Sequence, residues 1–139
     1  MTHPAHIQDM IDDFAFLDDW EDRYMHVIEL GKALPQLTEA ERNPATKVKG
    51  CVSQVWLVKA INGERLTYRG DSDAHIVKGL VGVTLALFSG QSAKDILAID
   101  AKAVFADLGL SEHLSMQRSN GLAAMVARIQ NDACALVGL

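Results

Sequence analysis

The feature that most limits the fold is a change of hydrophobic period. Up to about residue 35, apolar residues recur every three or four positions, as they do on helices. Val52–Val58 instead alternates between two faces, as a strand does. Asn62-Gly63 is the favoured two-residue hairpin turn, and Glu64–Arg69 returns as the partner strand. We therefore predict a β-hairpin over about residues 52–69.

Helical patterns flank this hairpin on both sides. A first helix should end at "LDDW", where Asp18 or Asp19 is the expected N-cap of a second helix that stops near Pro35. After the hairpin we expect four more helices. The first is a central buried helix with Asp71 and Ser72 as its N-terminal capping residues and Gly90 at its C-terminal end. The others are one that starts at Ser92, one that ends at Gly109 and one from Ser115 to Ala135. The predicted fold class is α+β: a small antiparallel β-sheet packed with helices.

Composition excludes several classes of function. The 139 residues suit one domain spanning 1–139, and a formal net charge of −5 argues against a nucleic-acid surface. Met1–Asp13 carries acids where a signal peptide has a basic region, and the apolar stretch Gly79–Phe88 is about half a membrane span. Because the chain has only Cys51 and Cys134, we expect no disulfide framework and a cytoplasmic location.

The same two cysteines limit metal chemistry. Neither lies in a CxxC motif, and the five histidines show no HxxxH pairing. Structural zinc and Fe–S clusters usually need four ligands. We expect no metal site within one chain.

Cys51 lies where a loop enters the predicted strand, directly after Gly50. On an extended chain Lys47 and Lys49 would share its side, and nearby cations raise the thiolate fraction. The alternative is a small apolar residue at a strand start beside solvated lysines. If the thiol is reactive, carrying sulfur is the function that needs the fewest other residues in the chain. Thiolate attack on a sulfane sulfur can use a site that a partner protein completes. Cys134, in an alanine-rich helix, is expected in the core.

Four segments resemble the signature segments of the SufE family, in family order and at family spacing over nearly the whole chain. They are "WEDRYMHVIELGKALP", "KVKGCVSQVWLV", "GDSDAHIVKGLVGV" and "LSMQRSNGLAAMVARI". The resemblance implies a SufE/IscU-like fold. It also implies a sulfur acceptor and carrier for Fe–S cluster assembly rather than an enzyme that turns over alone.

The resemblance also implies partners. A SufE-like protein takes sulfane sulfur from a PLP-dependent cysteine desulfurase of the SufS type, stimulates that enzyme and passes the sulfur to an Fe–S scaffold complex of the SufBCD type. PLP belongs to the desulfurase, so no cofactor of its own is expected. The acceptor of a Csd-type desulfurase is a close relative, which leaves the donor open. We expect no nucleic-acid or membrane partner, and a monomer or weak homodimer.

Carried over by position, Cys51 matches the sulfur-accepting cysteine, which would hold a persulfide. Arg118 matches the arginine of the RSxGL segment, implicated in sulfur transfer or partner contact. Asp73 and His75 fall in the segment near the cysteine loop, although a small residue is more usual where His75 stands. Gly50 gives this loop a hinge. We expect Cys51 to rest tucked against the sheet and to turn outward when the desulfurase binds.

Each site residue has a structural alternative. Asp73 also suits the positive end of a helix dipole, and His75 suits a plain surface position. Arg118 stands in the first turn of a predicted helix, where a cation is unfavourable, and this misfit favours a functional role. Lys47 and Lys49 stand in a stretch that varies within the family.

Two other functions stay open at this stage: an IscU-like Fe–S scaffold and a thiol-dependent peroxidase or hydrolase. One exposed cysteine per chain cannot hold a cluster unless chains pair.

Overall fold

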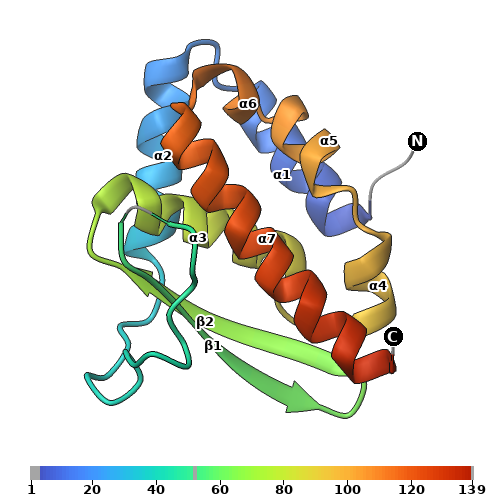
Figure 1. Cartoon of the computed structure of the whole chain (residues 1–139). Helices are drawn as coiled ribbons and strands as arrows, with labels where there is room; N and C mark the ends of the chain where they lie inside the picture. The colour runs from blue at the N-terminus through green and yellow to red at the C-terminus, as the bar shows by residue number, and fades with distance from the viewer. Residues whose placement is uncertain (1–3, 52, 139) are drawn as a thin grey trace.

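The structure, a computed structural model, describes residues 4–51 and 53–138 (Figure 1). These residues form an α+β fold, as predicted, with helices gathered on one side of a small sheet. The elements in chain order are α1 (Ala5–Ala15), α2 (Trp20–Lys32), β1 (Val55–Asn62), β2 (Arg65–Ser72), α3 (His75–Phe88), β3 (Gln91–Ser92), α4 (Ala93–Ala98), α5 (Ala101–Asp107), α6 (Leu110–His113) and α7 (Met116–Val137).

The sheet is antiparallel in the order β1-β2-β3. The predicted hairpin is confirmed, and Asn62 pairs with Arg65 across the turn. Its strands lie later than predicted, because β1 begins at Val55 and β2 runs on to Ser72. Val52, the predicted strand start, lies outside the described residues. The short β3 was not predicted, since two residues carry no strand pattern.

Helix α3 is the centre of the core, as its apolar circumference predicts. Ten of its 14 residues are buried. Its backbone comes unusually close to α2: a Cβ added to Gly79 would lie 2.4 Å from the Val27 carbonyl oxygen, and one added to Gly31 would lie 2.6 Å from the Gly79 nitrogen. Only glycine permits this approach. None of the helices in the described part of the chain is both long and apolar enough to cross a membrane.

Most predicted helix ends are confirmed. A side-chain oxygen accepts the backbone N–H three residues on at each of the N-caps Asp19, Ser92 and Ser115. Gly90 and Gly109 follow helices with φ of 83° and 81°, the left-handed region that glycine favours. The last helix ends two residues later than predicted, and the four-residue α6 is too short to give a periodic signal.

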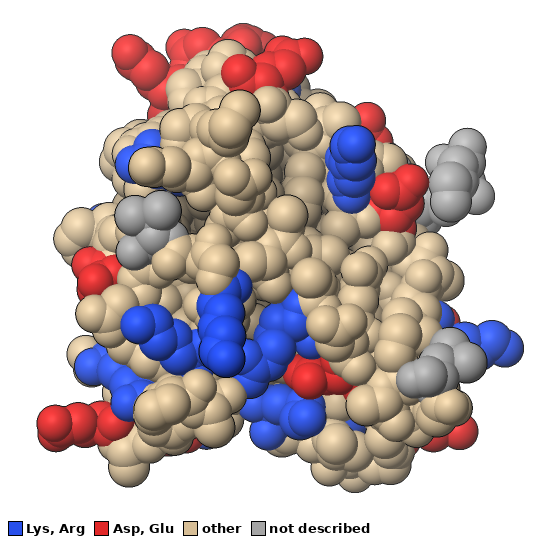
Figure 2. All heavy atoms as spheres, in the orientation of Figure 1, with Lys and Arg blue, Asp and Glu red and all other residues tan. Residues whose placement is uncertain are grey.

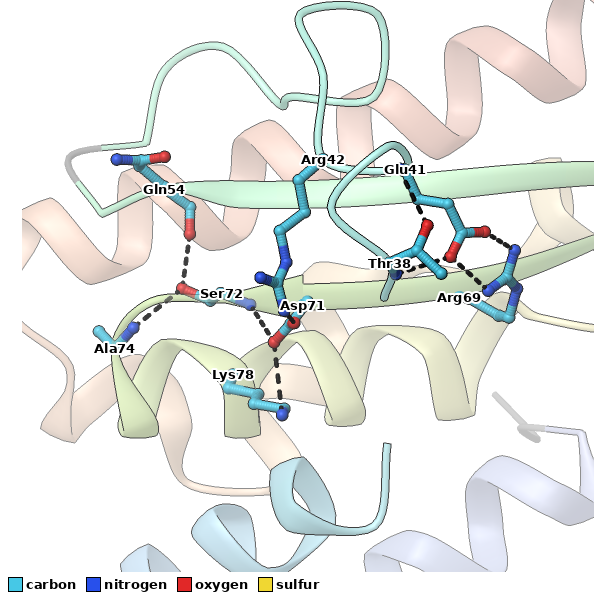
Figure 3. A network of polar contacts seen from close by, with 9 residues as sticks. All are labelled: Thr38, Glu41, Arg42, Gln54, Arg69, Asp71, Ser72, Ala74 and Lys78. Carbon is cyan, nitrogen blue, oxygen red and sulfur yellow. Dashed lines mark hydrogen bonds and ion pairs between the residues drawn. The ribbon is translucent and has the colours of Figure 1, made fainter. Parts of the chain in front are cut away.

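The predicted capping of α3 by Asp71 and Ser72 is wrong. Both residues lie in β2, and the N-cap of α3 is Ala74, which makes no side-chain cap. The Asp71 carboxylate is buried; it accepts a hydrogen bond from Arg42 at 2.7 Å and forms an ion pair with Lys78 at 3.3 Å (Figure 3). Tertiary contacts therefore use the polar groups that the sequence suggested as caps.

The loop at residues 38–46 is fastened to the sheet by the same network (Figure 3). Arg42 reaches Asp71 and also lies 5.7 Å from the centre of the Trp56 ring. Glu41 accepts hydrogen bonds from Arg69 and from the Thr38 N–H, and these bonds lower its pKa to about 2. The chain that leads to Cys51 is thus fixed before it reaches the cysteine.

Helix α7 is fastened to the hairpin through Asp132. Its carboxylate accepts a hydrogen bond from the Tyr68 hydroxyl at 2.8 Å and lies 3.6 Å from the Lys59 ammonium. Burial raises the pKa of Tyr68, and the bond to Asp132 raises it further, so the hydroxyl keeps its proton as the donor. This contact joins β1, β2 and α7.

Asp71→Asn should lower the free energy of unfolding at pH 7 by roughly 1–3 kcal/mol, because Arg42 and Lys78 lose their shared carboxylate. Burial is the largest influence on the pKa of Asp71 and raises it, but the hydrogen bonds from Arg42 and Ser72 and the charge of Lys78 together lower it. A lowered pKa contributes stability that is present above the unfolded pKa, about 3.9, and is lost as pH falls through the folded value.

Urea unfolding at pH 7 and pH 3 checks this prediction. The difference between the wild type and Asp71→Asn should be full at pH 7 and smaller at pH 3. Asp9→Asn, at an exposed position of α1, is the control and should cost less than about 0.5 kcal/mol. An Asp71→Asn penalty of the same size at both pH values would contradict the electrostatic account.

Candidate functional site

Cys51 follows a turn at Lys49–Gly50 and precedes β1. Gly50 has a φ of 94°, which L side chains rarely adopt, and an added Cβ would also lie 3.3 Å from the Ala124 Cβ. Because the chain turns here, the expected extended chain from Lys47 to Cys51 is wrong, although Lys47, Lys49 and Cys51 do line one hollow. Gly50 aims the cysteine back toward the body of the protein.

The thiol of Cys51 is half-buried against α7. Its Sγ donates to the carbonyl oxygen of Gly121 at 3.6 Å. A Cβ added to Gly121 would lie 3.6 Å from the same sulfur, so the thiol covers the space that a side chain would fill. The cysteine is therefore tucked in, and its nearest cover is α7 and not the sheet, where we expected it.

Burial raises the pKa of the Cys51 thiol. The hypothesis that Lys47 and Lys49 activate it is wrong for this conformation, because both lysines are exposed and neither offsets the effect of burial. A solvated ammonium is screened by water and salt, whereas desolvation acts directly on the thiolate. In this position the sulfur is mostly a thiol at neutral pH.

A cavity of about 350 Å³ opens beside Cys51, between the first turns of α3 and α7. Apolar side chains of both helices line most of its inner wall, and Arg118 lines its rim. The side chain of Arg118 is exposed, and its backbone N–H donates to the Ser115 hydroxyl. The structure thus brings Cys51 and Arg118, 67 positions apart in the chain, to one cavity.

Asp73 lies beside the Cys51 loop but not against the thiol. Its carboxylate accepts the Gln54 N–H at 3.1 Å, and its own N–H donates to the Gln54 carbonyl oxygen at 3.4 Å. Ser72 adds a hydroxyl hydrogen bond to the same oxygen at 2.7 Å (Figure 3). Asp73 therefore fixes the chain that leaves Cys51. His75, the exposed first residue of α3, does not line the Cys51 cavity.

The described residues bring together no group of three or more His, Cys, Asp or Glu side chains that would hold a metal ion. Cys134, on the far part of α7, is partly exposed and not fully in the core. Of the residues predicted for the site, Cys51 and Arg118 are the two that line this cavity.

Comparisons with known proteins place the chain in a family. The model of the family described as "SufE: Fe-S metabolism associated domain" matches residues 8–133. The chain belongs to the SufE family. Its relatives include a SufE-like protein of Rhizobium etli, 56% identical over 93% of this chain and 90% of that protein. Another is a SufE-like protein of Rhizobium meliloti, 55% identical over 91% of this chain and 94% of that protein.

A solved structure shows the same fold. The solution structure of a hypothetical protein from Thermus thermophilus superposes with a TM-score of 0.79 and covers 99% of this chain and 100% of its own, at 19% sequence identity. The family match carries an association with Fe–S metabolism. It agrees with the resemblance seen in the four sequence segments.

Two residues of this SufE domain were missed from the sequence. Arg128 of α7 donates to the carbonyl oxygens of Lys47 at 3.2 Å and Ala45 at 2.6 Å, which holds the chain before Cys51 onto the helix. No local pattern pairs residues 81 and 83 positions apart. Gly121, which contacts the thiol, did carry a signal, because a glycine inside a helix costs about 1 kcal/mol relative to alanine.

The segment Thr46–Val48 forms a stem that is bonded to β1. The Val48 N–H donates to the Val55 carbonyl oxygen at 2.8 Å, and the Leu57 N–H donates to the Thr46 carbonyl oxygen at 2.9 Å. With Arg128 on one side and Asp73 on the other, the chain is held on both sides of the turn that bears Cys51.

Alkylation of Cys51 by iodoacetamide should be slower than that of an unfolded thiol, with a pH midpoint above the ordinary value of about 8.5, because burial raises its pKa. The measurement uses the Cys134→Ser variant, so that one thiol reacts, and the same protein in urea as its reference. A folded-state midpoint below 8.5 would show a cation-activated thiolate and contradict this account.

Proposed function

We propose that this protein is a sulfur acceptor and carrier for Fe–S cluster assembly. It takes sulfane sulfur from a PLP-dependent cysteine desulfurase of the SufS type, holds it as a persulfide on Cys51 and passes it to a scaffold complex of the SufBCD type. The single observation that carries the proposal is a half-buried thiol after a glycine turn, beside a cavity that Arg118 also lines, in a SufE domain.

The transfer needs no co-reactant. The Cys51 thiolate attacks the outer sulfur of the donor persulfide and forms a new S–S bond. The S–S bond of the donor breaks, and the donor cysteine leaves as a thiolate that takes up the proton Cys51 has lost. The oxidised sulfur changes hands, so the count of S–S bonds stays constant.

The resting position of the thiol suits an accessory protein that acts with a partner. With its pKa raised and its Sγ bonded to the Gly121 carbonyl, Cys51 reacts slowly while the protein is alone. We infer that binding of the desulfurase turns the loop outward about Gly50, where water solvates the thiolate. Removing sulfur from the desulfurase would free that enzyme for another turnover. PLP stays on the desulfurase, and this chain needs no cofactor.

Arg118 would receive the anion that results. A persulfide on Cys51 carries its charge on the outer sulfur, and a guanidinium at the rim of the same cavity can donate charged hydrogen bonds to it. The exposed position of Arg118 also lets it contact the donor protein. The contact between this protein and the donor would have Gly50 and Asp73 at its edge, with His75 farther away.

Cys51 should be the residue that gains sulfur. After incubation of the wild type with a SufS-type desulfurase and L-cysteine, mass spectrometry should find one or two added sulfur atoms on the peptide containing Cys51, as thiolate attack predicts. Cys51→Ser should fold normally by circular dichroism and gain none, whereas Cys134→Ser should label as the wild type does. Labelling of Cys134 in the Cys51→Ser variant to the wild-type extent would overturn the assignment.

Arg118→Ala should slow sulfur transfer by about 10- to 100-fold, the loss expected for one charge-assisted hydrogen bond. Its stability should stay within about 0.5 kcal/mol of the wild type, because the side chain is exposed. Arg118→Lys should recover part of the rate, and Lys102→Ala, on α5, should have no effect. Transfer by Arg118→Ala at the wild-type rate would return this residue to a plain surface role.

A further inference from the structure

A groove lined by three cations lies beside the stem that carries Cys51. Its volume is about 570 Å³, and we call it the basic groove. Figure 2 shows Lys and Arg side chains gathered on this face of the molecule. The groove lies between the stem and α7, and its main lining residues are Lys47, Lys49, Ala124, Ala127, Arg128 and Asn131.

The basic groove leads to the thiol. Lys47 and Lys49 also line a second hollow, of about 400 Å³, whose wall includes Gly50 and Cys51. Arg118 lines the other cavity that Cys51 also lines. A molecule that approaches the cysteine from either hollow therefore meets cations.

These cations form no ion pair within the described part of the chain. Lys47 and Lys49 make no ion pair there, and Arg128 gives its hydrogen bonds to neutral carbonyl oxygens. Asp73 is exposed nearby and accepts only a backbone N–H. Three other carboxylates near this face already have cations of their own: Glu41 has Arg69, Asp71 has Arg42 and Lys78, and Asp132 has Lys59.

The charge of the protein is thus divided between its ends. The chain as a whole has a formal net charge of −5. Acidic side chains gather at the top of the view, by the turn between α1 and α2 (Figure 2). Glu21 and Asp22 stand in the first turn of α2. A positive surface on an acidic protein, placed at the reactive residue, orients an approaching partner.

We propose that the basic groove docks an acidic segment of the sulfur-donor protein, placed next to the donor's reactive cysteine. This inference rests on the proposed function and names the chemistry of the partner surface. The groove is pre-organised, because Arg128 and the Val48–Val55 hydrogen bond hold the stem in place. Ala124 and Ala127 leave room for an extended backbone to approach α7.

A protein partner fits this groove better than a nucleic acid. None of the described residues that line the groove is aromatic, so they offer no platform for stacking bases. The remaining surface is acidic and would repel a phosphate chain that runs beyond the groove. A carboxylate-bearing segment needs only the local cations.

The first test measures sulfur transfer from a SufS-type desulfurase to Cys51 against protein and salt concentration. Lys47→Glu/Lys49→Glu should lower the second-order rate constant at least tenfold at about 10 mM salt, where charges act over about 30 Å. The rate at saturating concentration should stay near that of the wild type. The salt dependence of the wild-type rate constant should flatten in the variant.

Lys94→Glu/Lys102→Glu is the matched control. It makes the same change in net charge at exposed positions in the first turns of α4 and α5, where an acid suits the helix dipole. Its second-order rate constant should fall less than that of the groove variant at about 10 mM salt, and should stay within about twofold of the wild type at about 100 mM salt, where charges act over only about 10 Å. Equal losses in both double variants, or a loss seen only at saturation, would overturn the proposal.

A second test is independent of sulfur transfer. In the Cys51→Ser protein, decaglutamate should shift the amide NMR signals of Lys47, Lys49 and Asn131, and the shifts should vanish in the Lys47→Glu/Lys49→Glu background. If the desulfurase transfers no sulfur to the wild type, the proposed function fails. The binding of decaglutamate then tests by itself whether the basic groove docks an acidic segment. Shifts elsewhere, or tighter binding of single-stranded DNA of equal length at these residues, would overturn the proposal.

Discussion

The carboxylate of Asp71 joins three parts of this small protein. It stands in β2, binds Lys78 of α3 and binds Arg42 of the loop at residues 38–46. That loop continues directly into the stem and the turn that present Cys51. The position of the thiol thus depends on a buried charge in the sheet, and Arg128 supplies a second attachment from α7.

Local chemistry explains why much of the fold could be predicted from the sequence. The hairpin follows from alternation and from Asn62-Gly63, and the N-caps at Asp19 and Ser115 need only a bond to a residue three positions on. The start of α3 could not be predicted in this way. Asp71 has the chemistry of a cap, but the tertiary network in which Arg42 and Lys78 contact it outweighs that local option.

The candidate site also has features that the sequence shows locally and features that depend on tertiary contacts. A thiol after a glycine and an arginine in the first turn of a helix are visible in the sequence, and both come to one cavity. The cover over the thiol is not visible, because Cys51 and Gly121 lie 70 positions apart. For the same reason the direction of the pKa shift could not be read from Lys47 and Lys49, since burial by α7 and not sequence proximity decides it.

The stem that carries Cys51 also has a consequence for aggregation. β1 is the outer strand of the sheet, and Thr46 and Val48 bond to its open edge at Leu57 and Val55. An open strand edge is a template for pairing with another chain. If the stem detached from β1 when Cys51 turned outward, each sulfur transfer would expose that edge. If only the chain after Val48 moves, the stem stays bonded to β1 and the edge stays covered. The distance that Cys51 can travel is therefore limited, because a longer movement would expose the β1 edge to pairing with another copy of the protein.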